Sequence, residues 1–104
     1  MAHDVFFRPR AEADLLELYH YIADTAGPLT AGRYIDRIET ACLSLASFPN
    51  RGVKRDDIAS GLRTISLERR LTIAYRVLKA RVEIVTIVDA GRDFESDLRN
   101  EANE

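Results

Sequence analysis

The chain has 104 residues, 46% of them hydrophobic, which suits one globular domain with a modest core, and we expect that domain to span residues 1–104. Its single cysteine, Cys42, excludes an intrachain disulfide, and no apolar run approaches the roughly 18 residues of a membrane span, so a soluble cytoplasmic protein is expected. The net charge of −2 conceals a basic middle, because residues 50–81 hold nine Lys or Arg and three Asp or Glu, whereas residues 1–49 and 82–104 are both acidic.

The first half of the chain predicts a strand followed by two helices. The β-favouring run Asp4–Arg8 ends at Pro9, a residue suited to the first position of a helix. Apolar residues spaced by three and four predict that this helix continues to about Thr25, with Glu12 and Asp14 largely off its buried stripe. After a break at residues 26–28, a second apolar stripe predicts another helix, closed by Pro49, from Ala31, Tyr34, Ile35, Ile38, Cys42, Leu45 and Phe48. So short a link makes the two helices an antiparallel hairpin.

The second half predicts a small antiparallel sheet. Asn50–Gly61 has no apolar period and is expected to be an irregular loop. The runs Leu62–Leu67, Leu71–Leu78 and Val82–Val88 are predicted strands, and their tight connections make them a meander. Residues 94–104 are acidic and form either a short last helix or a disordered tail. The predicted fold is therefore α+β: an N-terminal strand, an αα-hairpin and a three-stranded antiparallel meander (β-αα-βββ), with the helices on one face of the sheet.

The residues favour neither a metal site nor a nucleophilic enzyme. The two histidines, His3 and His20, lie far apart in sequence, and Cys42 falls on the core stripe of the second helix. The five glycines are scattered, so no phosphate-binding loop is present. We therefore predict no metal and no cofactor.

A set of cations is predicted to form a target-binding surface near the sheet: Arg63, Arg92, Lys54, Arg55 and Arg51, with Tyr75 beside them. Guanidinium groups bind phosphates and carboxylates bidentately, so both nucleic acid and an acidic protein surface fit this set. Cleavage of RNA also requires a proton shuttle, for which only Lys54 and Tyr75 are at hand. The competing interpretation is that the cations only keep the hairpin turns soluble.

Five segments also occur in an order typical of a known family: "RPRAEADLLELYHYIA" (Arg8–Ala23), "AGRYIDRIETACLSLASFPNRG" (Ala31–Gly52), "GLRTI" (Gly61–Ile65), "LTIAYRV" (Leu71–Val77) and "VEIVTIVDAGRD" (Val82–Asp93). Together they resemble the RelE/ParE superfamily of bacterial toxins from type II toxin–antitoxin systems, with a closer likeness to the ParE branch. Ribonuclease members of that superfamily carry a late tyrosine or histidine near the C-terminus. Here residues 90–94 read AGRDF and contain neither.

The resemblance implies a cognate antitoxin encoded in the same operon and, for a ParE-like toxin, inhibition of DNA gyrase without catalysis. Two alternatives stay open: a RelE-like ribosome-dependent mRNA endoribonuclease, and a non-toxic member that only binds an antitoxin. Four apolar residues lie beyond the stripes of the helical hairpin and are predicted to bind the antitoxin: Leu16, Tyr19, Tyr21 and Leu29. We expect an antitoxin segment to dock there as a helix or an added strand, unless these side chains complete the core of the toxin itself.

Overall fold

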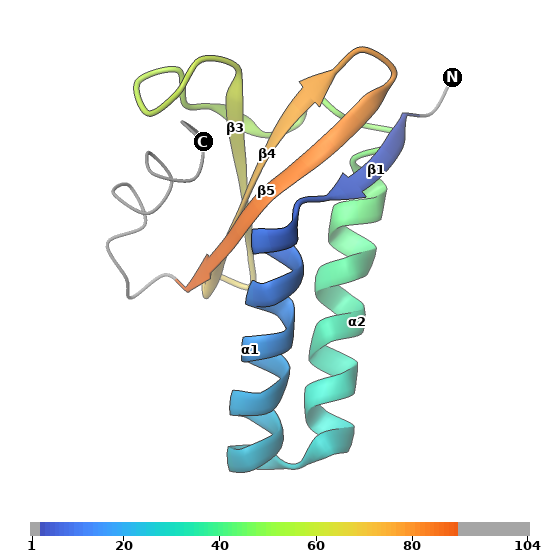
Figure 1. The fold of residues 1–104 in the computed structure, drawn as a ribbon, viewed down its shortest axis with the longest axis vertical. Helices are drawn as coiled ribbons and strands as arrows, with labels where there is room; N and C mark the ends of the chain where they lie inside the picture. The colour runs from blue at the N-terminus through green and yellow to red at the C-terminus, as the bar shows by residue number, and fades with distance from the viewer. Residues whose placement is uncertain (1–2, 90–104) are drawn as a thin grey trace.

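The computed structural model describes residues 3–89, which form two helices and a five-stranded sheet (Figure 1). The elements are β1 (Asp4–Phe7), α1 (Pro9–Ala26), α2 (Pro28–Ser44), β2 (Val53–Lys54), β3 (Leu62–Leu67), β4 (Leu71–Leu78) and β5 (Arg81–Asp89). The predicted α+β fold is confirmed, and the segment that was expected to be an irregular loop contains the two-residue strand β2. The acidic tail, residues 94–104, lies outside the described residues.

The sheet has the strand order β1-β5-β4-β3-β2. The strands β2 to β5 are antiparallel neighbours, whereas β1 runs parallel to β5, with Asp4 opposite Arg81 and Phe7 opposite Ile84. A parallel partner is possible because the helical hairpin and the meander lie between these two strands in sequence. The strand β5 is therefore flanked on both sides, which fits its nearly continuous apolar sequence.

The two helices are joined by a single residue, Gly27. Its φ of +93° lies in a region that glycine adopts readily, and its N–H donates to the carbonyl of Ala23 at 3.0 Å. Pro28 then occupies the first turn of α2. The closed end of the resulting hairpin projects beyond the end of the sheet (Figure 1). Neither helix is long and apolar enough to cross a membrane, within the described part of the chain.

One core lies between the helices and the sheet. It contains Ala11, Ile38, Cys42 and Leu45 from the helical side, packed on Leu71, Ile73, Tyr75, Val82, Ile84 and Ile87. The burial of Cys42 raises the pKa of its thiol to about 12, so this cysteine packs as an apolar residue, as expected. Phe48 departs from the prediction, because it is 66% exposed rather than part of the stripe.

A second, smaller apolar cluster covers the opposite face of the sheet. It consists of Ile58, Ala59, Leu62, Ala74, Val85 and Val88. The segment before β3 contributes Ile58 and Ala59 and so covers this face of the sheet. A β-bulge in β5 lets this strand contribute apolar side chains to both clusters. Ala74 pairs with Thr86 and Tyr75 pairs with Ile84, which leaves Val85 as the extra residue. Ile84 and Ile87 consequently both reach the helical core although they are three residues apart.

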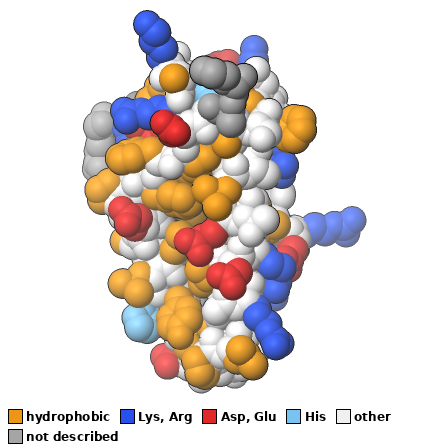
Figure 2. Space-filling model, turned by 90° about the vertical axis from the view of Figure 1, so that its right-hand side faces the viewer, with side chains coloured by type: hydrophobic (Ala, Val, Ile, Leu, Met, Phe, Trp, Pro, Cys, Tyr) orange, Lys and Arg blue, Asp and Glu red, His pale blue; other side chains and the backbone are white. Residues whose placement is uncertain are grey.

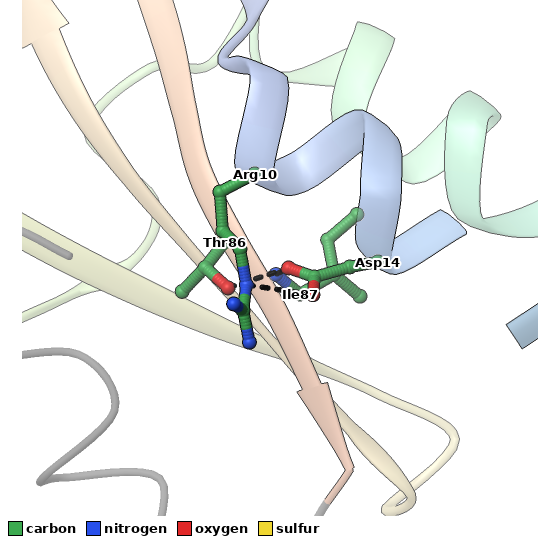
Figure 3. A network of polar contacts seen from close by, with 4 residues as sticks. All are labelled: Arg10, Asp14, Thr86 and Ile87. Atoms are coloured by element: carbon green, nitrogen blue, oxygen red, sulfur yellow. Dashed lines mark hydrogen bonds and ion pairs between the residues drawn. The ribbon is translucent and has the colours of Figure 1, made fainter. Parts of the chain in front are cut away.

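Asp14 is a second point, after Phe48, where the expected helix pattern is wrong. The residue is 7% exposed, and its carboxylate lies against β5 (Figure 3). One carboxylate oxygen accepts hydrogen bonds from the Thr86 hydroxyl at 2.6 Å and the Ile87 N–H at 3.0 Å, while the other accepts from Arg10 at 3.1 Å. The pairing of β1 with β5 stops at Ile84, so Asp14 supplies the acceptor that a longer edge strand would have offered.

Candidate functional site

The turn before β2 is fixed by a buried tyrosine. Tyr75 is fully buried at the middle of β4, where its hydroxyl donates to the carbonyl of Pro49 at 2.8 Å and accepts from the N–H of Gly52 at 2.9 Å. Burial raises the pKa of the Tyr75 phenol, so the hydroxyl keeps the proton that it donates. A Cβ at Gly52 would lie 2.5 Å from the hydroxyl oxygen of Tyr75, and therefore only glycine fits this close approach.

Arg63 fixes the same turn from the neighbouring strand. Its Nη1 donates to the carbonyl oxygens of Asn50 at 3.0 Å and Gly52 at 2.9 Å. Carbonyl acceptors carry no net charge, so the full positive charge of the guanidinium remains. Lys54 lies directly opposite Arg63 in the β2–β3 pair, and like charges in that position destabilise a sheet. Neither residue has an ion-pair partner among residues 3–89, so no carboxylate in that range compensates the two opposed charges.

The structure brings four of the five predicted cations to one edge of the sheet; we call Arg51, Lys54, Arg55 and Arg63 the basic turn. Arg51 is exposed and donates to the Ser44 hydroxyl at 3.1 Å. Arg55 is bound by both carboxylate oxygens of Asp57 at 3.0 Å, so its charge is offset. The fifth cation, Arg92, lies outside the described residues. Tyr75 has no exposed surface, so it supports the basic turn from within the core.

The predicted antitoxin-binding residues lie on more than one surface of the hairpin. Leu16 is exposed and Tyr19 half-buried, and both line a groove of about 360 Å³ whose walls include Phe7, Leu15 and Ile35. Tyr21 is exposed and lines a different cleft, and Leu29 is exposed near the start of α2. Viewed from the α2 side, apolar side chains form an interrupted band along the molecule (Figure 2).

The cleft that contains Tyr21 has a volume of about 890 Å³ and lies between the helical hairpin and the β3–β4 turn. Four arginines line it: Arg33 and Arg37 from α2, and Arg69 and Arg70 from the turn. Arg37 binds Glu68 through two hydrogen bonds of 2.7 and 3.3 Å, which ties the turn to α2. The sequence analysis missed this contact, because Arg37 and Glu68 are 31 residues apart and no local pattern links them.

Glu68 and Arg69 both adopt positive φ angles, of 52° and 59°. This left-handed conformation costs a non-glycine residue about 1–2 kcal/mol, so the turn is strained at the mouth of the cleft. No group of three or more His, Cys, Asp or Glu side chains lies close enough to hold a metal ion in residues 3–89. For binding, the basic turn offers positive charge, and the groove beside Leu16 and Tyr19 offers apolar area.

Comparison with known proteins agrees with this architecture. Residues 5–94 match the family model of the ParE toxin of the type II toxin–antitoxin system parDE. Toxin ParE3 of Caulobacter vibrioides is 29% identical over 85 residues, which cover 82% of this chain and 84% of that toxin. A structure of the chromosomal ParDE system from P. aeruginosa superposes with a TM-score of 0.75 and 26% identity, covering 85% of this chain and 96% of the other.

A mutant of the E. coli toxin RelE in the free state has the same fold, with a TM-score of 0.68 over 99% of this chain and 96% of the other. At 16% identity, that likeness concerns the fold alone. The match to the ParE model covers both helices and all of the described sheet except Asp4, the first residue of β1. The chain therefore belongs to the ParE toxin family and is the toxin component of a type II toxin–antitoxin system.

Proposed function

We propose that this toxin arrests growth by binding DNA gyrase through the basic turn, and that a cognate antitoxin from the same operon neutralises it. Membership of the ParE family supports gyrase as the target. The observation that carries the choice of surface is the pairing of Lys54 with Arg63. Like charges on directly paired strand residues destabilise the free protein, and an acidic surface on the target would relieve that repulsion.

The geometry favours an inhibitor over a RelE-like mRNA endoribonuclease. An RNA cleavage site needs a group that can take and return a proton near the bound phosphate. Near the basic turn, Tyr75 is buried, its hydroxyl already makes two hydrogen bonds, and the pKa of its phenol is raised by burial. Lys54 alone does not complete an acid–base pair. We therefore favour binding without catalysis.

Arg51 and Lys54 offer a sharper test than Arg63, whose side chain also holds the turn. We expect Arg51→Ala/Lys54→Ala to raise the concentration for half-inhibition of gyrase supercoiling on the order of ten- to a hundredfold, because each lost charge pair weakens the complex. The control, Lys79→Ala/Arg81→Ala, removes the same charge from the β4–β5 turn and the first residue of β5, and should inhibit like the wild type.

Three outcomes separate the candidate functions. Intact transcripts together with lost supercoiling support the gyrase inhibitor. Cuts at defined codon positions in mRNA that disappear with Lys54→Ala would establish the ribonuclease instead. A wild-type chain that is expressed without antitoxin and leaves growth unchanged would indicate the non-toxic member.

We further propose that the antitoxin binds the helical hairpin through Leu16, Tyr19, Tyr21 and Leu29. Apolar side chains that are exposed in the free toxin and buried in the complex contribute most to such interfaces. Leu16→Ala/Tyr21→Ala is therefore expected to raise the dissociation constant of the antitoxin on the order of a hundredfold.

Titration calorimetry with the product of the neighbouring operon gene measures this effect. Leu43→Ala is the matched control, since Leu43 is a similarly exposed leucine of α2 outside the proposed surface. Equal affinities of the double variant and the control would remove the hairpin from the antitoxin interface.

A further inference from the structure

The basic turn does not consist of cations alone. Phe48 is 66% exposed and Val53 is 67% exposed, and they flank Arg51 in the sequence. We propose that the segment 48–54 is a preformed contact element that seats the edge strand β2 in a groove of an acidic protein surface, where Phe48 and Val53 make apolar contacts, and that Tyr75 is the positioning residue of this element. The inference rests on the proposed function, because the partner is the toxin's protein target.

The mixture of side chains is typical of a binding surface. Single exposed apolar residues are common on soluble proteins and need no explanation. Here, however, an aromatic and an aliphatic side chain alternate with Arg51 and Lys54 within seven residues, and all four are exposed. Val53 and Lys54 project to opposite faces of the edge strand β2, so a partner that grips this edge can contact both. Aromatic residues and arginine are the types most enriched at the centres of protein interfaces.

The segment is held rigid by side chains that come from the sheet. The Tyr75 hydroxyl bridges Pro49 and Gly52, and Arg63 bridges Asn50 and Gly52. The backbone of the element is therefore ordered when the protein folds, and binding does not have to order it again. Preorganisation of this kind increases affinity without adding contacts.

Charge complementarity identifies the chemistry of the partner. The basic turn carries four cations, against which only Asp56 and Asp57 lie nearby in sequence. A protein surface fits better than a nucleic acid, because Val53 has no ring that could stack on a base and Phe48 is the only exposed aromatic residue of the segment. The expected groove thus offers apolar contacts to Phe48 and Val53 and has an acidic rim.

Purified variants test the contact residues in a gyrase supercoiling assay. We expect Phe48→Ala to raise the half-inhibitory concentration at least tenfold and Val53→Thr several-fold, since both would lose apolar contact with the target. Phe6→Ala is the matched control, because Phe6 is 44% exposed on β1, at the opposite edge of the sheet, and this variant should inhibit like the wild type.

Tyr75→Phe tests the positioning role. The variant loses the hydroxyl that holds the turn, so we expect weaker inhibition of gyrase together with an unchanged affinity for the antitoxin. A merely structural effect would lower both activities in parallel with the melting temperature, and would therefore contradict the positioning role.

Induced growth arrest gives a second measurement that does not depend on the identity of the target. If Phe48→Ala and Val53→Thr retain full activity in both measurements while the wild type is active, the inference is overturned. If the wild type arrests growth but does not inhibit gyrase, the proposed target is wrong. In that case, weaker growth arrest by Phe48→Ala and Val53→Thr supports the inference, and full growth arrest overturns it. If Phe48→Ala and Val53→Thr weakened binding to a nucleic acid instead of to a protein, the inferred acidic protein partner would be wrong. A wild-type protein that neither arrests growth nor inhibits gyrase would overturn both the proposed function and this inference.

Discussion

Replacing Gly52 by alanine should destabilise the protein by about 3 kcal/mol, which combines steric overpacking with the loss of a buried hydrogen bond. The added Cβ would lie 2.5 Å from the Tyr75 hydroxyl oxygen, 2.8 Å from a Tyr75 ring carbon and 3.0 Å from the carbonyl oxygen of Thr64. Tyr75 is fully buried in the centre of the sheet and cannot move aside without disturbing the helical core. The turn must therefore shift, and the hydrogen bond between Gly52 and Tyr75 is lost with it.

Urea denaturation measures this loss as a lower midpoint at an unchanged slope. Gly32→Ala is the matched control, because a Cβ at Gly32 in α2 meets nothing within 4 Å. The control is expected to gain up to about 1 kcal/mol, since alanine favours a helix over glycine. A Gly52→Ala variant as stable as the wild type would show that the turn is not packed on Tyr75 as described.

The sequence predicted the meander more accurately than any other part of the fold. The bounds of β3 and β4 agree with the predicted runs residue for residue, because both runs end at a charged turn. The order of the strands could not be predicted in the same way. β1 has four residues, and its parallel pairing with β5 depends on contacts about 80 residues apart in the chain, which no local pattern records.

Phe48 shows how a correct pattern can be extended too far. The apolar stripe of α2 assumes 3.6 residues per turn, but α2 ends at Ser44. From there, Leu45, Ala46 and Ser47 donate to carbonyls three residues earlier, which is the tighter spacing of a 3₁₀ turn. The phase of the stripe shifts within this turn, and Phe48 consequently points to solvent instead of the core.

The candidate site was only partly visible in the sequence. Arg51, Lys54, Arg55 and Arg63 were recognised from their charge and their closeness to one strand, and the structure places them at one edge of the sheet. The roles of Tyr75 and Gly52 were not foreseen, because they depend on hydrogen bonds between a side chain and backbone atoms 23 and 26 residues away. Such contacts follow from the packing of the sheet and leave no periodic signal.

Asp14 supports the sheet in a comparable way, and Asp14→Ala should destabilise the protein by about 3 kcal/mol. The substitution removes the acceptor of the Ile87 N–H and of the Thr86 hydroxyl, both of which are buried. The hydroxyl can rotate towards another acceptor, but the N–H is fixed by the strand and stays unsatisfied. Asp14→Asn keeps an oxygen for this N–H, so a smaller loss of about 1 kcal/mol is expected.

Amide hydrogen exchange of Ile87, followed by NMR, reports on the bond directly. In Asp14→Ala the Ile87 amide should exchange faster than expected from the loss of global stability, whereas in Asp14→Asn its protection should fall only in proportion to that loss. Asp36→Ala, which removes an exposed carboxylate from α2, is the control and should change the free energy of unfolding by less than about 0.5 kcal/mol. If Asp14→Ala behaved like this control, the carboxylate could not be what completes the edge of β5 beyond Ile84.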